Sequence, residues 1–286
     1  MSKEFLHQEF EVAQAGADIK EGSRWGRVGK VFTSIFFSFS IFLTIGAVIF
    51  TVIFFISIVE GSSMMVTLNA DYIYPGVLPE NNIKDSVLVN RTLKPNYADI
   101  IVVKHIWGEE GKHCNPKKEP GKEEFFIKRV IGLEGDKISF NRYGAGTSGN
   151  PYTYKTVRNG EEIDEWYLVD EKFGLMFDYG QHIYEYLNGG TPTSQLFVPF
   201  GDCITENPET GVREIVVPAG HIFFMGDNRG GKDWYSLSSY DCTAFGPQAI
   251  TLVEGVVVDR IDHLETIPQY AWRKFLEFFS FKWLFG

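Results

Sequence analysis

The chain has 286 residues, 37 acidic against 27 basic side chains, a formal net charge of −10 and a pI near 5.2. This length is long for one domain and short for three, and it is enough to bury a sizeable core. The excess of acidic residues argues against nucleic-acid binding, because proteins that bind nucleic acids normally carry a basic surface patch. The mean hydropathy of −0.10 is typical of a soluble protein, but this average hides a marked local concentration of apolar residues.

The first predicted element is an uncharged apolar run from Val31 to Val59, 29 residues that include eight Phe. About 20 apolar residues span a bilayer, and a core helix of a soluble domain is rarely so long or apolar on every side. A cleavable signal peptide would have an apolar region about half as long and would not follow thirty largely polar residues. The run therefore predicts a retained transmembrane anchor at 31–59.

The charges that flank this run predict its orientation. Lys20, Arg24, Arg27 and Lys30 precede the run, and no Lys or Arg follows it until Lys84. By the positive-inside rule, residues 1–30 are expected in the cytoplasm and residues 60–286 outside, on a single-pass protein of the cytoplasmic membrane.

Residues 60–286 are predicted to be mostly strand, in short runs rich in Val, Ile and Phe and separated by Gly, Pro, Asn or Asp. Seven runs show this pattern: Ser86–Asn90, Asp99–Lys104, Glu124–Gly132, Lys137–Phe140, Glu214–Val217, His221–Gly226 and Leu252–Val258. Residues 107–122 are polar and predict an exposed loop. Residues 141–213 have weaker apolar periodicity and predict an insertion or small subdomain within the main sheet.

The C-terminal segment 271–286 is basic and strongly aromatic. It is too short and too charged to span a bilayer, and its composition predicts a segment that lies on the membrane surface. The alternative is a helix packed on the protein's own sheet.

All three cysteines, Cys114, Cys203 and Cys242, lie in the predicted outer region, where disulfides form. Three thiols permit at most one internal pair. Cys203–Cys242 is the first choice, because Cys114 lies in the polar loop.

Three segments of the outer region carry candidate catalytic residues. Ser63 follows the apolar run within the segment Glu60–Leu68, and a nucleophilic serine needs a base. Lys128 is the candidate base: in a strand it shares a face with Phe126 and Val130, and burial lowers a lysine pKa. In the third segment, Asp227 and Arg229 can form an ion pair that orders the backbone around a site.

The sequence gives less support to a catalytic histidine or to a metal site. None of the outer histidines stands in a triad motif. The pair His113-Cys114 has no second ligand pair at metal spacing, so both are expected to be solvated loop residues.

Taken together and in this order, the three segments resemble type I signal peptidases, which are serine proteases with a Ser-Lys dyad. Ser63–Leu68 resembles the Ser-Met-x-Pro-Thr-Leu nucleophile box, Phe126–Asp136 the Lys-Arg…Gly-x-x-Gly-Asp box, and Gly226–Arg229 the Gly-Asp-Asn-Arg box. Shorter similarities lie at Asp99–Val103 and Val217–His221, so the resemblance covers most of residues 60–260 outside the insertion.

The resemblance implies roles for individual residues. Ser63 would be the nucleophile, with its amide as one oxyanion donor, and Lys128 the general base. Ser62 is not the matching serine, because the spacing to Met64 and Thr67-Leu68 selects Ser63. Supporting residues would be Gly61, Arg129, Asp227, Asn228 and Arg229. Gly61 stands where some members have a serine that supplies a second oxyanion donor.

The chain departs from the family pattern at two places. Val66 replaces the usual proline, which makes the turn less rigid. The segment after Arg229 lacks an aligned counterpart of the serine that orients the lysine, and Ser236 or Ser238 is left as a substitute.

The resemblance implies a mainly β fold: a signal-peptidase-like antiparallel catalytic core with an inserted subdomain, behind one transmembrane helix. The implied function is a membrane-bound serine endopeptidase that removes signal peptides with small residues at −3 and −1 from exported preproteins, without metal or cofactor. Its expected partners are those preproteins, the lipid bilayer and the secretion machinery. Two alternatives stay open: a specialised relative that matures a pilin or conjugation component, and a catalytically inactive, membrane-anchored β-domain used for binding.

Overall fold

A computed structural model of the chain describes residues 3–61, 63–64, 67–68, 84–106, 123–145, 153–170, 174–175, 180–189, 203–208, 211–227, 241–261 and 266–279. The chain divides into two compact units, 1–53 and 54–286.

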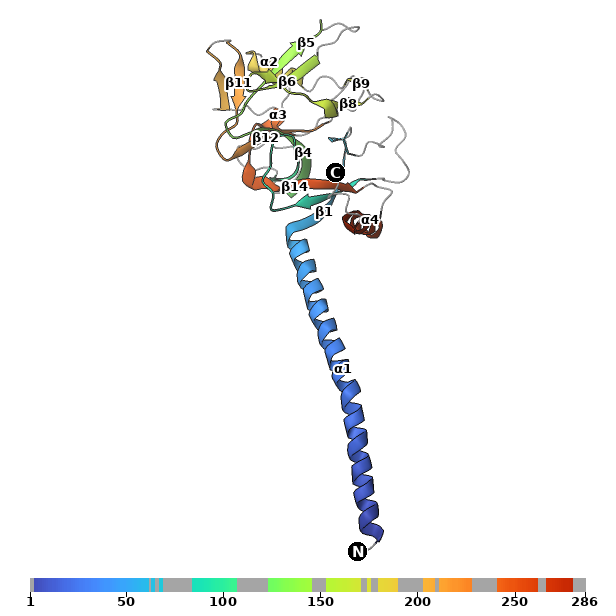
Figure 1. The fold of residues 1–286 in the computed structure, drawn as a ribbon. Helices are drawn as coiled ribbons and strands as arrows, with labels where there is room; N and C mark the ends of the chain where they lie inside the picture. The colour runs from blue at the N-terminus through green and yellow to red at the C-terminus, as the bar shows by residue number, and fades with distance from the viewer. Residues whose placement is uncertain are drawn as a thin grey trace. The chain divides into compact units, whose positions relative to one another are not determined.

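The first unit is one long helix, α1 (Lys3–Ile53), shown in blue in Figure 1. Its stretch Val28–Ile53 has a mean hydropathy of 2.4. In length and composition these 26 residues can cross a bilayer. The apolar run continues to Val59, but the helix ends at Ile53, and Phe54–Ile58 form strand β1.

The second unit is built on a seven-stranded sheet with the order β1-β2-β14-β3-β4-β12-β13, in which every neighbouring pair is antiparallel. The strands after β1 are β2 (Ser86–Asn90), β3 (Ile100–Ile106), β4 (Glu123–Leu133), β12 (His221–Met225), β13 (Gln248–Ala249) and β14 (Val253–Ile261). β4 pairs with β3 along most of its length and with β12 only from Arg129 onward.

A five-stranded sheet is inserted between β4 and β12, with the order β10-β11-β5-β6-β7. Its strands are β5 (Lys137–Tyr143), β6 (Thr153–Arg158), β7 (Glu161–Glu162), β10 (Ile204–Glu206) and β11 (Arg213–Val216). Figure 1 shows β5, β6 and β11 together with helix α2 (Gly180–Leu187) at one end of this unit. The strands β8 (Val169–Asp170) and β9 (Gly174–Leu175) form a separate two-stranded sheet.

The predicted fold class, a mainly antiparallel β protein with an insertion behind one apolar helix, is confirmed. Each of the seven predicted strands overlaps an observed one, at β2, β3, β4, β5, β11, β12 and β14. The remaining described helices are α3 (Cys242–Phe245), α4 (Ile267–Phe279) and the 3₁₀ turns η1 (Trp166–Leu168) and η3 (Ile250–Leu252).

Two hydrophobic clusters hold the unit together. The larger one joins the two sheets, through residues such as Val130 on β4, Phe223 on β12 and Ile215 on β11. The smaller one packs Met64 and Leu68 against Val87, Val102 and other buried residues of the seven-stranded sheet. The second cluster therefore fixes the short segment that carries Ser63.

Candidate active site

Ser63 lies in a turn that is fixed on its C-terminal side. The Thr67 and Leu68 amides donate to the Met64 carbonyl oxygen at 3.0 and 2.8 Å, and the Met64 and Leu68 side chains are buried. Burying two such side chains stabilises the turn by roughly 1.5–3 kcal/mol each. Before the turn, Gly61 has φ = 83°, a left-handed conformation that favours glycine over serine. Ser63 itself is half-buried.

Lys128 reaches this turn from β4, which is 65 residues away along the chain. Its Nζ lies 2.8 Å from Ser63 Oγ and donates to the Ile127 carbonyl oxygen at 3.0 Å. The side chain is only 2% exposed, and its Nζ lies 5.2 Å from the centre of the Phe126 ring. The structure thus brings together the two residues that the sequence singled out as nucleophile and base.

Burial is the main reason why the pKa of Lys128 falls from its ordinary value of 10.5 to about 8. An ammonium loses its hydration inside the protein, so the neutral amine is favoured. The negative charges of Asp241 and Asp227 act in the opposite direction and limit the fall. A lysine with a pKa near 8 is neutral in a useful fraction of molecules at mildly alkaline pH, which a free lysine is not.

Next to Lys128, Arg129 forms a buried ion pair with Asp227. Its Nε and Nη2 donate to the two carboxylate oxygens at 2.8 and 2.6 Å, and Nη1 donates to the Ala98 carbonyl oxygen at 2.8 Å. The Thr67 hydroxyl also donates to Asp227, and Tyr167 stacks its ring 4.0 Å from the Arg129 guanidinium. This network ties the Ser63 turn, β4 and the end of β12 together.

Asp227 has a partner that the sequence did not point to. Its carboxylate binds Arg129, 98 residues away along the chain. The predicted pair of Asp227 with Arg229 is not tested. Asn228, Arg229, Ser236 and Ser238 lie outside the described residues.

Asp241 is a supporting residue that the sequence reasoning missed. It is fully buried, accepts from the Gly226 amide at 3.0 Å, and caps α3 by accepting from the Thr243 amide at 3.0 Å. Asp is one of the residues most often found as a helix N-cap, so the sequence held a weak signal for this role. Asp241 fixes the backbone just before Asp227 and adds negative charge near Lys128.

The preferred disulfide, Cys203–Cys242, is not formed in the structure. Cys242 is a free thiol buried under β12, where its Sγ accepts from the Phe224 amide at 3.2 Å and faces the Ile222 carbonyl oxygen. Burial raises the pKa of this thiol well above its usual range. The expectation was wrong because it ranked the cysteines by exposure alone, and core packing places Cys242 against the backbone of β12. Cys114 lies outside the described residues.

A cleft of about 610 Å³ opens beside Ser63 and Lys128. One side is lined by Ser57 and Ile58 of β1 with Glu60 and Gly61, and the other by residues 123–128 of β4. Consecutive residues of β4 line the cleft. The cleft therefore borders an edge of this strand, because only every second side chain would line a cleft on the face of a sheet. The shape suits an extended peptide.

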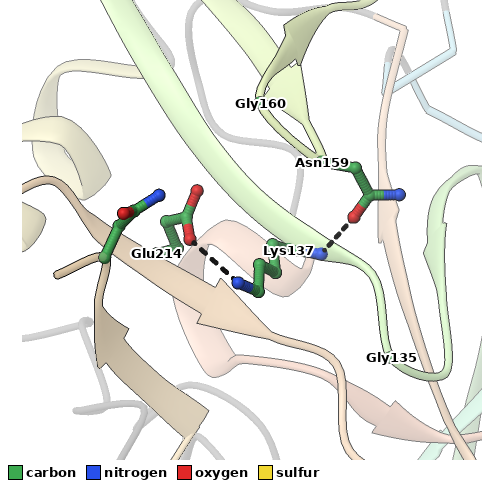
Figure 2. Close-up of a pocket in the computed structure, with 6 residues that line it drawn as sticks. Gly135, Lys137, Asn159, Gly160 and Glu214 are labelled. Carbon is green, nitrogen blue, oxygen red and sulfur yellow. Dashed lines mark hydrogen bonds and ion pairs between the residues drawn. The ribbon is translucent and has the colours of Figure 1, made fainter. Parts of the chain in front are cut away.

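A second, smaller cleft of about 320 Å³ lies on the inserted sheet and shares no lining residue with the first (Figure 2). There Lys137 pairs with the buried carboxylate of Glu214 at 3.8 Å, and its amide donates to Asn159 Oδ1 at 2.9 Å. The ion pair supplies the countercharge that a buried carboxylate needs. The lining residues include no nucleophile with a base, so this cleft is not a candidate active site.

Chemically, the pair Ser63–Lys128 has what nucleophilic catalysis requires. A neutral amine within hydrogen-bond distance of a hydroxyl can take its proton as the oxygen attacks a carbonyl carbon. None of the residues that line the cleft is a histidine. Among the described residues, no group of three His, Cys, Asp or Glu is arranged as metal ligands.

Comparison with known proteins places this site in context. Residues 32–258 match the family model described as signal peptidase, peptidase S26. The chain is 30% identical over 200 residues to signal peptidase I of Bacillus caldolyticus, an alignment that covers 70% of this chain and 75% of the relative. A crystal structure of a signal peptidase I from Enterococcus faecalis V583 aligns at 21% identity over 58% of this chain and 98% of that chain, with a TM-score of 0.26.

Proposed function

Since the chain belongs to the signal peptidase family, peptidase S26, and is a serine peptidase, we propose that it is a membrane-bound endopeptidase that removes signal peptides from exported preproteins. The observation that carries the proposal is the 2.8 Å contact between Lys128 Nζ and Ser63 Oγ, with Lys128 buried and its pKa lowered. A solvated lysine in chance contact with a serine would keep its ordinary pKa.

In the proposed reaction, Ser63 Oγ attacks the carbonyl carbon of the scissile bond while its proton passes to neutral Lys128. The Lys128 ammonium then gives this proton to the departing amine, which becomes the new N-terminus of the mature protein. The signal peptide is left as an ester on Ser63. Lys128, neutral again, takes a proton from a water whose oxygen attacks the ester carbon. As the bond from this carbon to Ser63 Oγ breaks, the Lys128 ammonium returns the proton to Oγ, and the signal peptide leaves with its new carboxylate.

The Ser63 amide is the proposed oxyanion donor. Gly61 brings no hydroxyl of its own, and its left-handed backbone indicates a conformational role before the nucleophile. Arg129 and Asp227 are proposed to position this turn relative to β4, because Thr67 joins the ion pair to the Ser63 segment.

The cleft supports an extended substrate. A peptide that lies along the β4 edge can add to it as a strand, with its scissile carbonyl opposite Ser63. Family membership suggests small residues at −3 and −1. The α1 helix is the proposed anchor, and the basic residues before it support a proposed orientation with residues 60–286 on the outer side of the cytoplasmic membrane.

The test is cleavage of a purified preprotein with an Ala-x-Ala site by the full-length protein in detergent. We expect cleavage after the −1 Ala, a strong loss when that Ala is replaced by Phe, and no cleavage with Ser63→Ala. The matched control is Ser62→Ala, which is expected to keep substantial activity.

An active Ser63→Ala with an inactive Ser62→Ala would refute the nucleophile assignment. A wild-type protein that binds the preprotein but never cleaves it would favour the inactive binding domain. Activity confined to a pilin-type substrate would favour the specialised relative.

A further inference from the structure

Asp85 holds the chain on the N-terminal side of the candidate nucleophile. Its carbonyl oxygen accepts from the Val59 amide at 2.9 Å, and Val59 precedes Ser63 by four residues. The neighbouring Lys84 pairs with Glu60, one residue further along the same segment. Asp85 lies directly before β2 and is only 1% exposed. The segment that leads to Ser63 is therefore attached to a buried residue of the seven-stranded sheet.

Arg260 on β14 extends this attachment to the C-terminal side of the nucleophile. Its Nε lies 3.0 Å from Asp85 Oδ2, and its Nη2 donates to Asp85 Oδ1 at 3.3 Å. The same guanidinium directs Nη1 to the Thr67 carbonyl oxygen, a long hydrogen bond of 3.5 Å, and Thr67 follows Ser63 by four residues. The Asp85 carboxylate is fully buried. Arg260 thus supplies a countercharge for that carboxylate and links it to the nucleophile turn.

The Thr67 main chain passes this restraint on toward Ser63. The Thr67 amide donates to the carbonyl oxygen of Met64, the residue next to Ser63, at 3.0 Å. The Thr67 hydroxyl belongs to the Arg129 ion pair, whereas the Thr67 carbonyl oxygen belongs to the Arg260 ion pair. Two separate ion pairs therefore hold two different sides of one residue in this turn.

We propose that Asp85 and Arg260 are a positioning pair for the candidate protease: they hold both ends of the segment 59–67 and so set the place of Ser63 relative to Lys128. Neither residue of the pair lines the cleft beside Ser63. Their effect on catalysis therefore acts through Ser63 and not through contact with the substrate. This inference rests on the proposed function, which assigns no role to Asp85 or Arg260.

The two members of the dyad are positioned in different ways. Lys128 lies within β4, and the ladder from β4 through β3 to β14 fixes its backbone. Ser63 lies outside the strands, so its 2.8 Å contact with Lys128 Nζ depends on what attaches its segment to that sheet. Arg260 provides such an attachment from β14, where it pairs in register with Val87 of β2. A displacement of about 1 Å between reacting groups can cost about a hundredfold in rate.

The test measures kcat and KM on the Ala-x-Ala preprotein with the full-length protein in detergent. Arg260→Lys keeps a positive charge beside Asp85 but loses the two-pronged contact with its carboxylate and the reach to Thr67. We expect kcat to fall by roughly tenfold to a hundredfold while KM is unchanged, because the cleft stays intact and only the alignment of the reacting groups is lost. The matched control is Arg91→Lys. Arg91 directly follows β2 and pairs with Glu254 of β14 at 3.6 Å, and this variant should keep the wild-type kcat.

A double variant separates positioning from stability. Arg260→Gln leaves the buried Asp85 carboxylate without this countercharge and should lower both the urea midpoint and kcat. Adding Asp85→Asn removes the buried charge, so the urea midpoint should return toward that of the wild type. The kcat of the double variant should stay low, because the two amides do not restore the link to Thr67.

Three results would overturn the positioning role and leave the proposed function in place. They are a wild-type kcat in Arg260→Lys, a raised KM at unchanged kcat in that variant, and a double variant that regains kcat together with its stability. A wild-type protein that never cleaves the preprotein would overturn the proposed function and the positioning role together.

Discussion

The pH dependence of cleavage is the most direct test of Lys128 as the general base. Burial lowers the pKa of this lysine to about 8, and only its neutral form can accept the Ser63 proton. Between pH 6 and pH 9 the neutral fraction of such a lysine rises from about 1% to about 90%, so kcat/KM should rise roughly 90-fold and then level off. With an ordinary lysine pKa, the rate would still climb tenfold per pH unit at pH 9.

The assay measures kcat/KM on an Ala-x-Ala preprotein in half-unit steps from pH 6 to pH 10. The low-pH limb should have a slope of one in a logarithmic plot and bend near the pKa of Lys128 in the free enzyme. Lys128→Arg keeps the positive charge and much of the length but cannot deprotonate in this range, so it should be inactive throughout. Lys128→Ala should be equally inactive.

Near-normal turnover of Lys128→Arg would refute this reasoning. So would a bend near pH 6.5, which would indicate a histidine as the base. A profile without a plateau up to pH 10 would show that burial does not lower the pKa as the structure requires.

Three further predictions follow from the same region. Asp227→Ala leaves the Arg129 guanidinium buried without this partner and should lower the free energy of unfolding by about 3–5 kcal/mol, measured by urea unfolding in detergent. The control is Lys155→Ala, which removes an exposed ion pair with Glu162 and should lower the free energy of unfolding by at most about 1 kcal/mol. Lys128→Met should be more stable than the wild type by about 3 kcal/mol at pH 7 and by little near pH 10.5. The wild type is the less stable protein at pH 7 because the pKa of Lys128 is lower in the folded state than in the unfolded state. Its free energy of unfolding therefore falls as pH falls from about 10.5 to 8. An equal stability difference between Lys128→Met and the wild type at both pH values would contradict this reasoning. Gly255→Ala would place a methyl group 2.6 Å from the Asn90 carbonyl oxygen and should destabilise the β14–β2 pairing by roughly 1–3 kcal/mol, and an unchanged urea midpoint would show that the strands have room to separate.

Much of the fold could be predicted from local sequence patterns. Short runs of Val, Ile and Phe between turn residues predicted seven strands, because strand formation depends on side chains that suit a pleated, half-buried surface. The long uncharged run predicted the apolar helix. Motif spacing selected Ser63 and Lys128 from the many serines and lysines of the outer region. The family followed from three motifs in order, and the comparisons confirm it.

Local patterns could not show where the apolar run changes structure. Phe54–Ile58 continues the composition of α1, yet it pairs with Ser86–Asn90 as β1. A half-buried strand and a membrane helix both appear as apolar sequence. Only the presence of a partner strand, supplied by residues some thirty positions away, decides between them.

The chemistry of the candidate site depends on contacts that no local pattern contains. Lys128 has a lowered pKa because the folded chain buries it, and Asp227 binds Arg129, which lies 98 residues away along the chain. Cys242 stays a thiol because packing sets it against β12. The sequence by itself determined which residue types and motifs are present and the elements they form. Tertiary structure decided which of these residues are in contact and how far they are excluded from solvent, because burial and long-range pairing are properties of the folded chain as a whole.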